Sequence, residues 1–179
     1  TPTARFAAET ALLDLEARRQ DISLARLLSS DSTSRKIAVN AIVGGGSTDE
    51  TISNALLAVK QGFTCLKFKV GTAQPGSDVE RIAAVRTAVG DSVLIRLDAN
   101  GAWDAATAIS TLRRLATLDI EYIEQPVESI EDLAVLTRAG ILPIAADESA
   151  QHPSGAERVI DLHAADLLVI KPMAAGGLI

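Results

Sequence analysis

Six short apolar runs typical of β-strands recur along the chain at nearly constant spacing, and this repeat limits the fold more than any other feature. Their starts lie 23 to 29 residues apart. Between the runs, apolar residues recur three and four positions apart, as on one face of a helix; Ile52, Ala55 and Val59 are an example. Alternating strands and helices with short links predict parallel strands joined by right-handed crossovers. The runs span residues 37–42, 64–70, 93–98, 120–124, 143–147 and 167–171.

Helix starts are marked by a serine followed three positions later by an acidic residue, the pattern of an N-terminal capping pair. A further helix is expected at about residues 3–19, before the first strand, and the triple glycine at 44–46 is expected in the loop after that strand. We therefore expect one domain over residues 1–179. The capping pairs are Ser47 with Glu50, Ser77 with Glu80, Ser129 with Asp132, and Ser154 with Glu157.

Composition excludes several classes of protein. The 179 residues are 47% hydrophobic and 22% charged, which is enough to bury one substantial core. A net charge of −6 disfavours nucleic acids and anionic membranes as partners, because both attract clustered Lys and Arg. No apolar stretch approaches the roughly 18–20 residues that span a bilayer, and the first residues do not resemble a signal peptide. We expect a cytoplasmic protein.

Charged residues distinguish two architectures that six such units fit, an open doubly wound sheet and part of an eightfold barrel. Strands of an open sheet are covered by helices on both faces and should be apolar on both. Here every run from the second onward has a charged residue at or near its C-terminal end, where barrels build active sites. We therefore predict an α/β fold, a partial TIM-type (β/α) barrel of about six units. The charged residues are Lys67, Lys69, Asp98, Glu124, Asp147 and Lys171.

Side-chain alternation directs Lys67 and Lys69 into the barrel, because residues two apart on a strand share a face. Asp98 shares its inward face with Arg96, which we interpret as part of an ion pair inside the barrel. Burial and mutual repulsion lower the pKa of at least one lysine, which makes it a usable general base. Alone, two lysines one residue apart would fit an exposed edge strand. The charges on the other strands favour the inward arrangement.

Three carboxylates, Asp98, Glu124 and Asp147, lie at the ends of three successive predicted strands. Left without partners they would be costly to bury, whereas Mg²⁺ binds oxygen ligands and keeps positions open for substrate. Lys171 would then face Lys67 and Lys69 across the cation. This arrangement predicts a site that stabilises negative charge on a substrate carboxylate while a lysine moves a proton.

Five motifs, "LKFKVG", "LDANGAW", "YIEQP", "ADES" and "VIKP", occur in this order and resemble the barrel motifs of the enolase superfamily, specifically its muconate lactonizing enzyme subgroup. The resemblance implies abstraction of the proton α to a carboxylate through an enediolate, assisted by Mg²⁺ or alternatively Mn²⁺. It implies Asp98, Glu124 and Asp147 as metal ligands, with Asn100 and Glu148 supporting them. It also implies Lys69 and Lys171 as the lysines on the two faces of the substrate, and Lys67 as the group that lowers the pKa of Lys69 and helps neutralise the substrate carboxylate.

Within that subgroup, the segments "ARFAAETALLDLEAR" and "VNAIV" are similar to those of o-succinylbenzoate synthases. This similarity implies a carbon–oxygen lyase of menaquinone biosynthesis, in which Lys69 takes the α-proton and returns it to the departing hydroxide. An N-succinylamino acid racemase or a dipeptide epimerase is the alternative on the same scaffold, with both lysines exchanging protons. A third interpretation is a truncated, non-catalytic barrel piece.

Members of this family have an N-terminal α+β capping domain, for which this chain has no room. An eightfold barrel also needs about 200 residues or more, and the sequence stops after the sixth run. We expect the missing strands and capping domain of a longer enzyme as partners of this piece, besides a small-molecule carboxylate substrate; a homo-oligomer is a further alternative. An open barrel would expose two apolar edges. Alone, the piece is expected to bind metal weakly and to have little activity.

Overall fold

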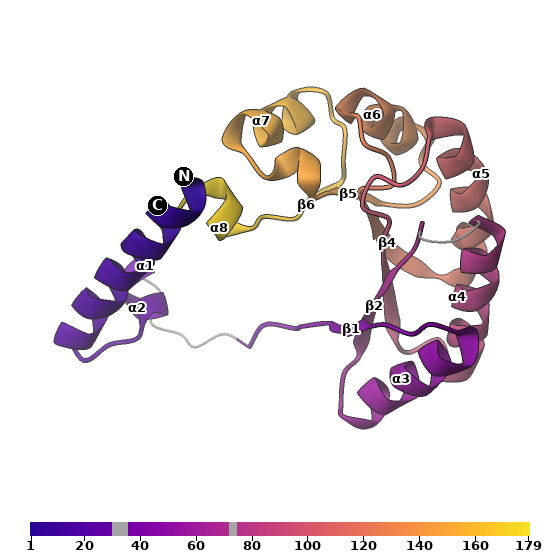
Figure 1. The fold of residues 1–179 in the computed structure, drawn as a ribbon, viewed down its shortest axis with the longest axis horizontal. Coiled ribbons are helices and arrows are strands. Elements are labelled where there is room, and N and C mark those ends of the chain that lie inside the picture. Colours follow the sequence, from indigo (N-terminus) through magenta and orange to yellow (C-terminus); the bar gives the residue numbers. More distant parts are fainter. Residues whose placement is uncertain (30–35, 72–74) are drawn as a thin grey trace.

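All six strands are parallel and pair in chain order from β1 to β6. The computed structural model describes residues 1–29, 36–71 and 75–179. Figure 1 shows that the sheet curves into an arc with helices along its outer side. This is the predicted partial (β/α) barrel. The strands are β1 (Ala41–Val43), β2 (Cys65–Lys69), β3 (Leu94–Asp98), β4 (Ile120–Glu124), β5 (Ile144–Ala146) and β6 (Leu167–Leu168).

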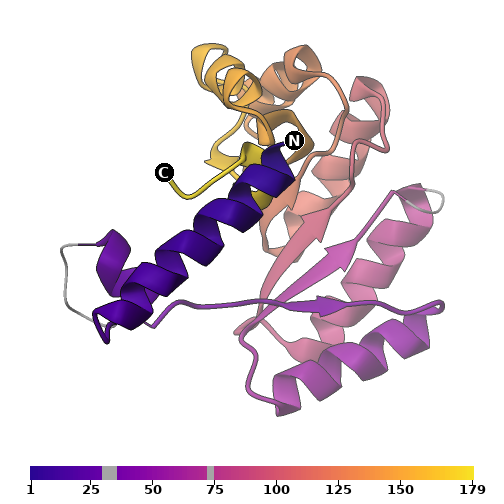
Figure 2. The ribbon, with the colours of Figure 1, turned by 60° about the vertical axis from the view of Figure 1, so that its left-hand side comes forward.

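The first helix, α1 (Pro2–Arg19), confirms the helix expected at residues 3–19. It lies on the open side of the arc and packs against α8 near the other end of the chain (Figures 1 and 2). Within the described ranges, no helix has the length and apolar character needed to cross a membrane. The other helices are α2 (Leu24–Leu28), α3 (Thr48–Lys60), α4 (Pro75–Val89), α5 (Ala105–Leu115), η1 (Ala116–Leu118), α6 (Ile130–Ala139), η2 (Glu148–Ala150), α7 (Pro153–Asp161) and α8 (Pro172–Ala175).

Two of the four predicted helix caps are confirmed. Ser47 and Glu50 form a reciprocal capping box at α3, and the Ser129 hydroxyl accepts a hydrogen bond from the Asp132 backbone N–H at α6. The predictions at Ser77 and Ser154 are wrong, because α4 begins at Pro75 and α7 at Pro153. Proline suits the first helical position, since its fixed φ matches the helix and its missing N–H would have no partner there.

The inner strands follow the predicted boundaries closely, whereas the two outer strands are shorter than predicted. Pairing of β1 with β2 begins at Ala41, and pairing of β6 with β5 ends at Leu168. Each outer strand has a neighbour on one side only, so fewer hydrogen bonds hold its ends in the sheet. At the end of the last run, Pro172 begins α8 and has no N–H to extend a ladder.

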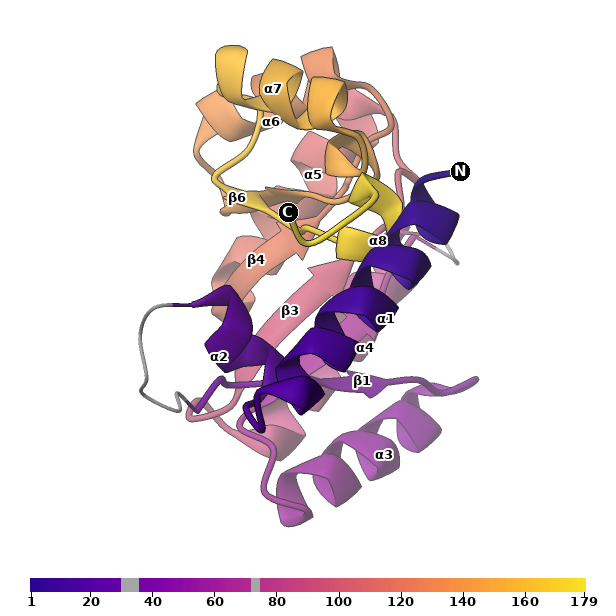
Figure 3. The same ribbon diagram turned by 90° about the vertical axis from the view of Figure 1, so that its left-hand side faces the viewer.

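The hydrophobic core lies between the outer face of the sheet and the surrounding helices. Leu66, Phe68 and Leu97 are completely buried there, as alternation predicts. Apolar side chains of the inner face remain open, with Ile42 80% and Leu94 46% exposed. Figure 3, viewed from the open side, shows α1 passing in front of this inner face. The expected exposure of apolar surface by an incomplete barrel is therefore present.

Candidate active site

The predicted charged residues gather at the carboxyl ends of the strands. Lys69 is the last residue of β2, Asp98 of β3 and Glu124 of β4. The strand register pairs Lys69 with Asp98 and Asp98 with Glu124, so these three positions lie at one level of the sheet. Asp147 directly follows β5, and Lys171 follows β6.

Two lysines form ion pairs with the three carboxylates. The Lys67 Nζ lies 2.9 Å from Asp98 Oδ2 and also donates to Glu124 Oε2. On the far side of the site, the Lys171 Nζ lies 2.5 Å from Asp147 Oδ2. The carboxylates are buried, with Asp98 6%, Glu124 2% and Asp147 2% exposed. Lys67 therefore points inward, as alternation predicts, and links the ends of two neighbouring strands.

Burial and charge shift the pKa values of Glu124 and Lys67. Burial raises the pKa of Glu124; Lys67 opposes the rise through its hydrogen bond and charge, while Asp98 and Asp147 add to it. Burial alone would lower the pKa of Lys67, but its hydrogen bonds to Glu124 and Asp98 outweigh burial and raise it. Lys67 is therefore not a lysine whose pKa is lowered by the pairing of two inward lysines. Glu124 and Asp98, two of the predicted metal ligands, are the partners that raise its pKa.

The donor set suits a divalent cation, although the side chains do not enclose one as they lie. Among the described residues, no group of three or more His, Cys, Asp or Glu side chains is arranged to hold a metal ion. Instead, Lys67 and Lys171 neutralise the carboxylates. Asp147 Oδ1 is buried without a hydrogen-bond partner in the described part of the chain, which leaves one oxygen ready for a ligand. Hard oxygen donors of this kind fit Mg²⁺.

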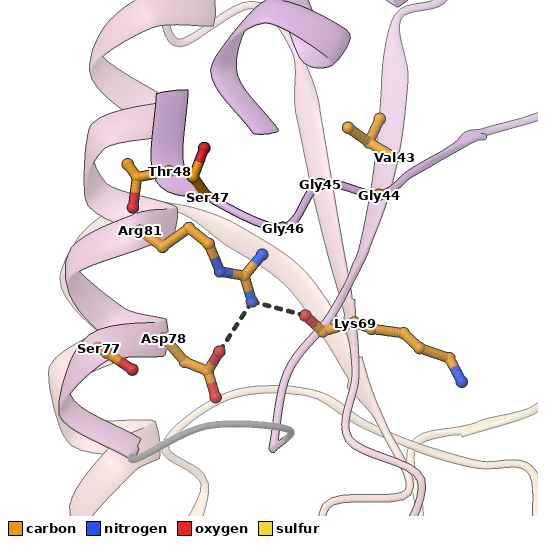
Figure 4. Close-up of a pocket in the computed structure, with 10 residues that line it drawn as sticks. All are labelled: Val43, Gly44, Gly45, Gly46, Ser47, Thr48, Lys69, Ser77, Asp78 and Arg81. Carbon is orange, nitrogen blue, oxygen red and sulfur yellow. Dashed lines mark hydrogen bonds and ion pairs between the residues drawn. The ribbon is translucent and has the colours of Figure 1, made fainter. Parts of the chain in front are cut away.

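Lys69 is exposed, and helix α4 holds the end of its strand from outside. The Arg81 Nη2 donates to the Lys69 carbonyl over 2.7 Å and to Asp78 Oδ1 over 2.8 Å. Asp78 is 1% exposed, and its other oxygen accepts from the Gly71 N–H at 2.8 Å. Figure 4 shows Lys69, Asp78 and Arg81 around a pocket beside the glycines 44–46, with the Lys69 ammonium directed away from it. This pair was not predicted; its signal in the sequence is an acid and an arginine three positions apart on a helix.

Asn100 and Glu148, predicted to support the metal ligands, contact each other. The Asn100 Nδ2 donates to Glu148 Oε1 over 2.9 Å, and the Asn100 backbone N–H donates to Asp98 Oδ1 over 3.2 Å. Asn100 has a φ of 46°, in the left-handed region that asparagine tolerates better than most residues. The loop after β3 therefore reaches the segment after β5 through this pair. Their support of a metal ligand stays a prediction.

Arg96 forms an ion pair inside the barrel, but not with its face neighbour Asp98. Its Nε lies 2.7 Å from Glu121 Oε2, and its Nη1 donates to Asn40 Oδ1 over 3.1 Å. Lys67 takes the place beside Asp98. The register between β3 and β4 shifts after Ile95, so that Arg96 pairs with Tyr122 and Glu121 is skipped. This irregularity, which alternation does not predict, accompanies the pairing of Arg96 with Glu121.

The fold and the site together define a partial (β/α) barrel with buried carboxylates and lysines at the carboxyl ends of its strands. A family model described as "Enolase C-terminal domain-like" matches residues 50–179. The chain belongs to this family and, with relatives that include muconate cycloisomerases, to the muconate lactonizing enzyme subgroup of the enolase superfamily.

Relatives of several activities match the chain. It is 36% identical to the L-Ala-D/L-Glu epimerase of Clostridium acetobutylicum over 98% of this chain and 49% of that protein. It is 38% identical to the o-succinylbenzoate synthase of Thermobifida fusca over 79% of this chain and 44% of that protein. The crystal structure of the dipeptide epimerase from Enterococcus faecalis matches with a TM-score of 0.92 and 33% identity, over 99% of this chain and 52% of that one. The chain thus spans about half the length of the curated relatives it matches.

Proposed function

We propose that the full-length protein is a Mg²⁺-dependent epimerase that removes the proton α to a substrate carboxylate and returns a proton to the opposite face of the same carbon. One observation supports the proposal: Lys69 at the end of β2 and Lys171 after β6 lie on either side of three buried carboxylates, which end β3 and β4 and follow β5. The order of the strands supports two bases, because Lys69 comes before the row of carboxylates in the sheet and Lys171 after it.

Each charged side chain has a distinct task in this reaction. Asp98, Glu124 and Asp147 would hold Mg²⁺, which when bound supplies positive charge to stabilise the enediolate. Lys67 stays protonated, because its two carboxylate partners raise its pKa. Lys69 takes or gives the proton on one face of the α-carbon and Lys171 does so on the other. Each lysine must lose its proton before it can act as the base.

The assignment to an epimerase differs from the lyase that the sequence favours. The epimerase relatives match 98% of this chain, including α1, whereas the o-succinylbenzoate synthase matches 79%. A dipeptide epimerase structure in this comparison is complexed with Mg and the dipeptide L-Leu-L-Tyr. We therefore place a dipeptide first as substrate class.

The lyase remains the second candidate, because the Thermobifida fusca o-succinylbenzoate synthase is 38% identical, the same identity as the Bacillus subtilis L-Ala-D/L-Glu epimerase. In an elimination, Lys69 would serve first as base and then as acid to the departing hydroxide. Lys171 would act as a cation beside the enediolate and would not exchange a proton with the substrate.

Incubation with L-Ala-L-Glu and L-Leu-L-Tyr in D₂O with Mg²⁺, followed by NMR, separates the two candidates. An epimerase incorporates deuterium at the α-carbon and accumulates the second diastereomer. Lys69→Ala and Lys171→Ala should each stop inversion, and each should still exchange the α-proton of one epimer. Dehydration of the o-succinylbenzoate precursor without dipeptide exchange would instead identify the lyase. If the protein catalyses neither reaction, the proposed chemistry is wrong and a non-catalytic role gains support.

A further inference from the structure

Gln125, directly after Glu124, uses every hydrogen-bonding group of its buried side chain. It is 1% exposed. The Nε2 donates to the Val127 carbonyl over 2.9 Å and to the Ser149 Oγ over 2.7 Å. The Oε1 accepts from the backbone N–H groups of Asp147, at 3.0 Å, and Ser149, at 3.2 Å. The amide therefore joins the end of β4 to the segment after β5.

The backbone of the same residue extends these links to neighbouring strands. The Gln125 N–H donates to the Ala145 carbonyl of β5 over 2.8 Å, and its carbonyl accepts from the Gly101 N–H in the loop after β3 at 2.6 Å. Gln125 has a φ of 40°, an uncommon value for a residue other than glycine, and the surrounding hydrogen bonds hold it there. One residue thus connects the three chain segments that carry Asp98, Glu124 and Asp147.

We propose that Gln125 is a positioning residue that sets the relative placement of the three carboxylates for the divalent cation; this inference rests on the proposed function. Its contact with Asp147 is the most direct, because it fixes the N–H of a residue whose backbone (φ −111°, ψ −81°) lies outside the helical and strand regions. Holding this backbone orients the carboxylate whose Oδ1 has no partner in the described residues. Metal affinity depends on such outer contacts as well as on the ligands.

An amide suits this position better than a carboxylate or an apolar side chain. A glutamate would lose both N–H donors and add a fourth negative charge beside three buried carboxylates. An apolar side chain of similar length would leave the N–H groups of Asp147 and Ser149 without their acceptor. Gln125→Met is therefore the informative change, because it removes all four side-chain hydrogen bonds without altering the charge.

Arg86 provides a matched control at the other end of the sheet. It is 8% exposed, and its guanidinium donates four hydrogen bonds to backbone carbonyls near the starts of β3 and β4. Arg86→Met removes the same number of side-chain hydrogen bonds, at the opposite ends of the strands from the carboxylates. The acceptors are the carbonyls of Leu118, Gly90, Val93 and Asp119, at distances between 2.7 and 3.0 Å.

The experiment measures Mg²⁺ affinity by calorimetric titration of the full-length protein, beside thermal unfolding without metal. Both variants should lower the melting temperature of the metal-free protein. Gln125→Met should also weaken Mg²⁺ binding by about 10–100-fold, as loss of contacts around a metal site does, while Arg86→Met should leave the affinity at the wild-type value. A milder variant, Ser149→Ala, removes one contact of the Gln125 amide and should weaken binding a few-fold even if Gln125→Met does not fold.

Each alternative outcome has a separate meaning. Wild-type protein that binds neither Mg²⁺ nor Mn²⁺ contradicts the proposed function. If the wild type binds Mg²⁺ and both Gln125→Met and Ser149→Ala bind it equally well, the positioning role is overturned while the proposed function stands. Equal losses of affinity in Gln125→Met and Arg86→Met also overturn it, because they would show a general effect of destabilisation. An unchanged Ser149→Ala beside an unfolded Gln125→Met counts against the proposal as well.

Discussion

Arg86 and Gln125 connect neighbouring elements at opposite ends of the same parallel sheet. Each is a buried polar side chain with four hydrogen bonds, some of them to groups on other chain segments. All four acceptors of Arg86 are backbone carbonyls near the starts of strands. Gln125 instead both donates and accepts, and it follows a buried carboxylate in the chain.

The difference between these residues follows from what surrounds them. The starts of β3 and β4 need their free carbonyls satisfied, and a cation with five N–H groups does this well. At the carboxyl ends, three buried carboxylates already concentrate negative charge, so a neutral amide can hold the loops without changing the charge of the site. In barrels, the amino ends of the strands serve stability and the carboxyl ends serve chemistry. If this chain divides stability and chemistry in that way, variants at the two ends should differ in which property they change.

The largest effect is expected at the carboxyl end, from Lys69→Ala. Loss of a general acid–base group costs about 10²–10⁴-fold in turnover. Lys69 is exposed, so the free energy of unfolding should change by less than about 0.5 kcal/mol. Lys60→Ala, another exposed lysine at the end of α3, is the control and should leave turnover unchanged. Steady-state kinetics and urea unfolding measure the two effects. A Lys69→Ala variant that lost stability and kept its turnover would contradict a catalytic role for the carboxyl ends of the strands.

Arg86→Met tests the amino end and should show the reverse pattern. We expect a loss of about 3 kcal/mol in the free energy of unfolding, because the buried Arg86 guanidinium gives up four charged hydrogen bonds, one of them to the buried Val93 carbonyl. The Michaelis constant and turnover should stay at wild-type values at temperatures where the variant is folded. Urea unfolding monitored by Trp103 fluorescence gives the first quantity, and kinetics below the melting range give the second. A variant as stable as the wild type would show that these contacts contribute little.

Binding of Mg²⁺ at the carboxyl ends of the strands should also stabilise the folded protein. At a Mg²⁺ concentration 100 times the Kd, binding to the folded state adds about 2.7 kcal/mol to the free energy of unfolding. Glu124→Gln removes a charged ligand and should lose most of this increment. Glu121→Gln is the matched control, since this carboxylate lies on the same strand but pairs with Arg96. Urea unfolding with and without Mg²⁺ measures this gain in stability for each variant. An equal gain in Glu124→Gln and Glu121→Gln would exclude Glu124 as a ligand.

The inward charges could be predicted because they depend on local alternation along strands. Lys67 and Asp98, which form an ion pair, lie within β2 and β3, where a spacing of two residues determines the face. The barrel likewise follows from the repeat of strand and helix. The short outer strands could not be predicted, because the length of a strand depends on the neighbours that pair with it.

The two buried connectors were missed for a different reason. Gln125 bonds to groups 22 and 24 residues away, and Arg86 to carbonyls 32 and 33 residues away, as well as to nearer groups. Nothing in their local sequence distinguishes a glutamine after a strand or an arginine on a helix from a solvated one. The raised pKa of Lys67 could not be predicted from its own strand either, because its carboxylate partners come from two other strands.

The smallest effect should come from Glu148→Ala, which breaks an exposed contact in the same region that Gln125 holds. The Asn100 amide donates to Glu148 over 2.9 Å, but both residues are exposed, so water competes for the same groups. We expect a loss of about 0.5 kcal/mol or less in stability, near the lower limit for a hydrogen bond. Mg²⁺ affinity, measured by calorimetric titration, should fall by no more than about threefold, because the buried amide of Gln125 still fixes the Asp147 backbone. If Glu148→Ala weakened Mg²⁺ binding as much as Gln125→Met, the exposed Asn100–Glu148 pair would position the carboxylates as strongly as the buried amide. Burial of a supporting residue would then not explain how much it contributes to metal affinity.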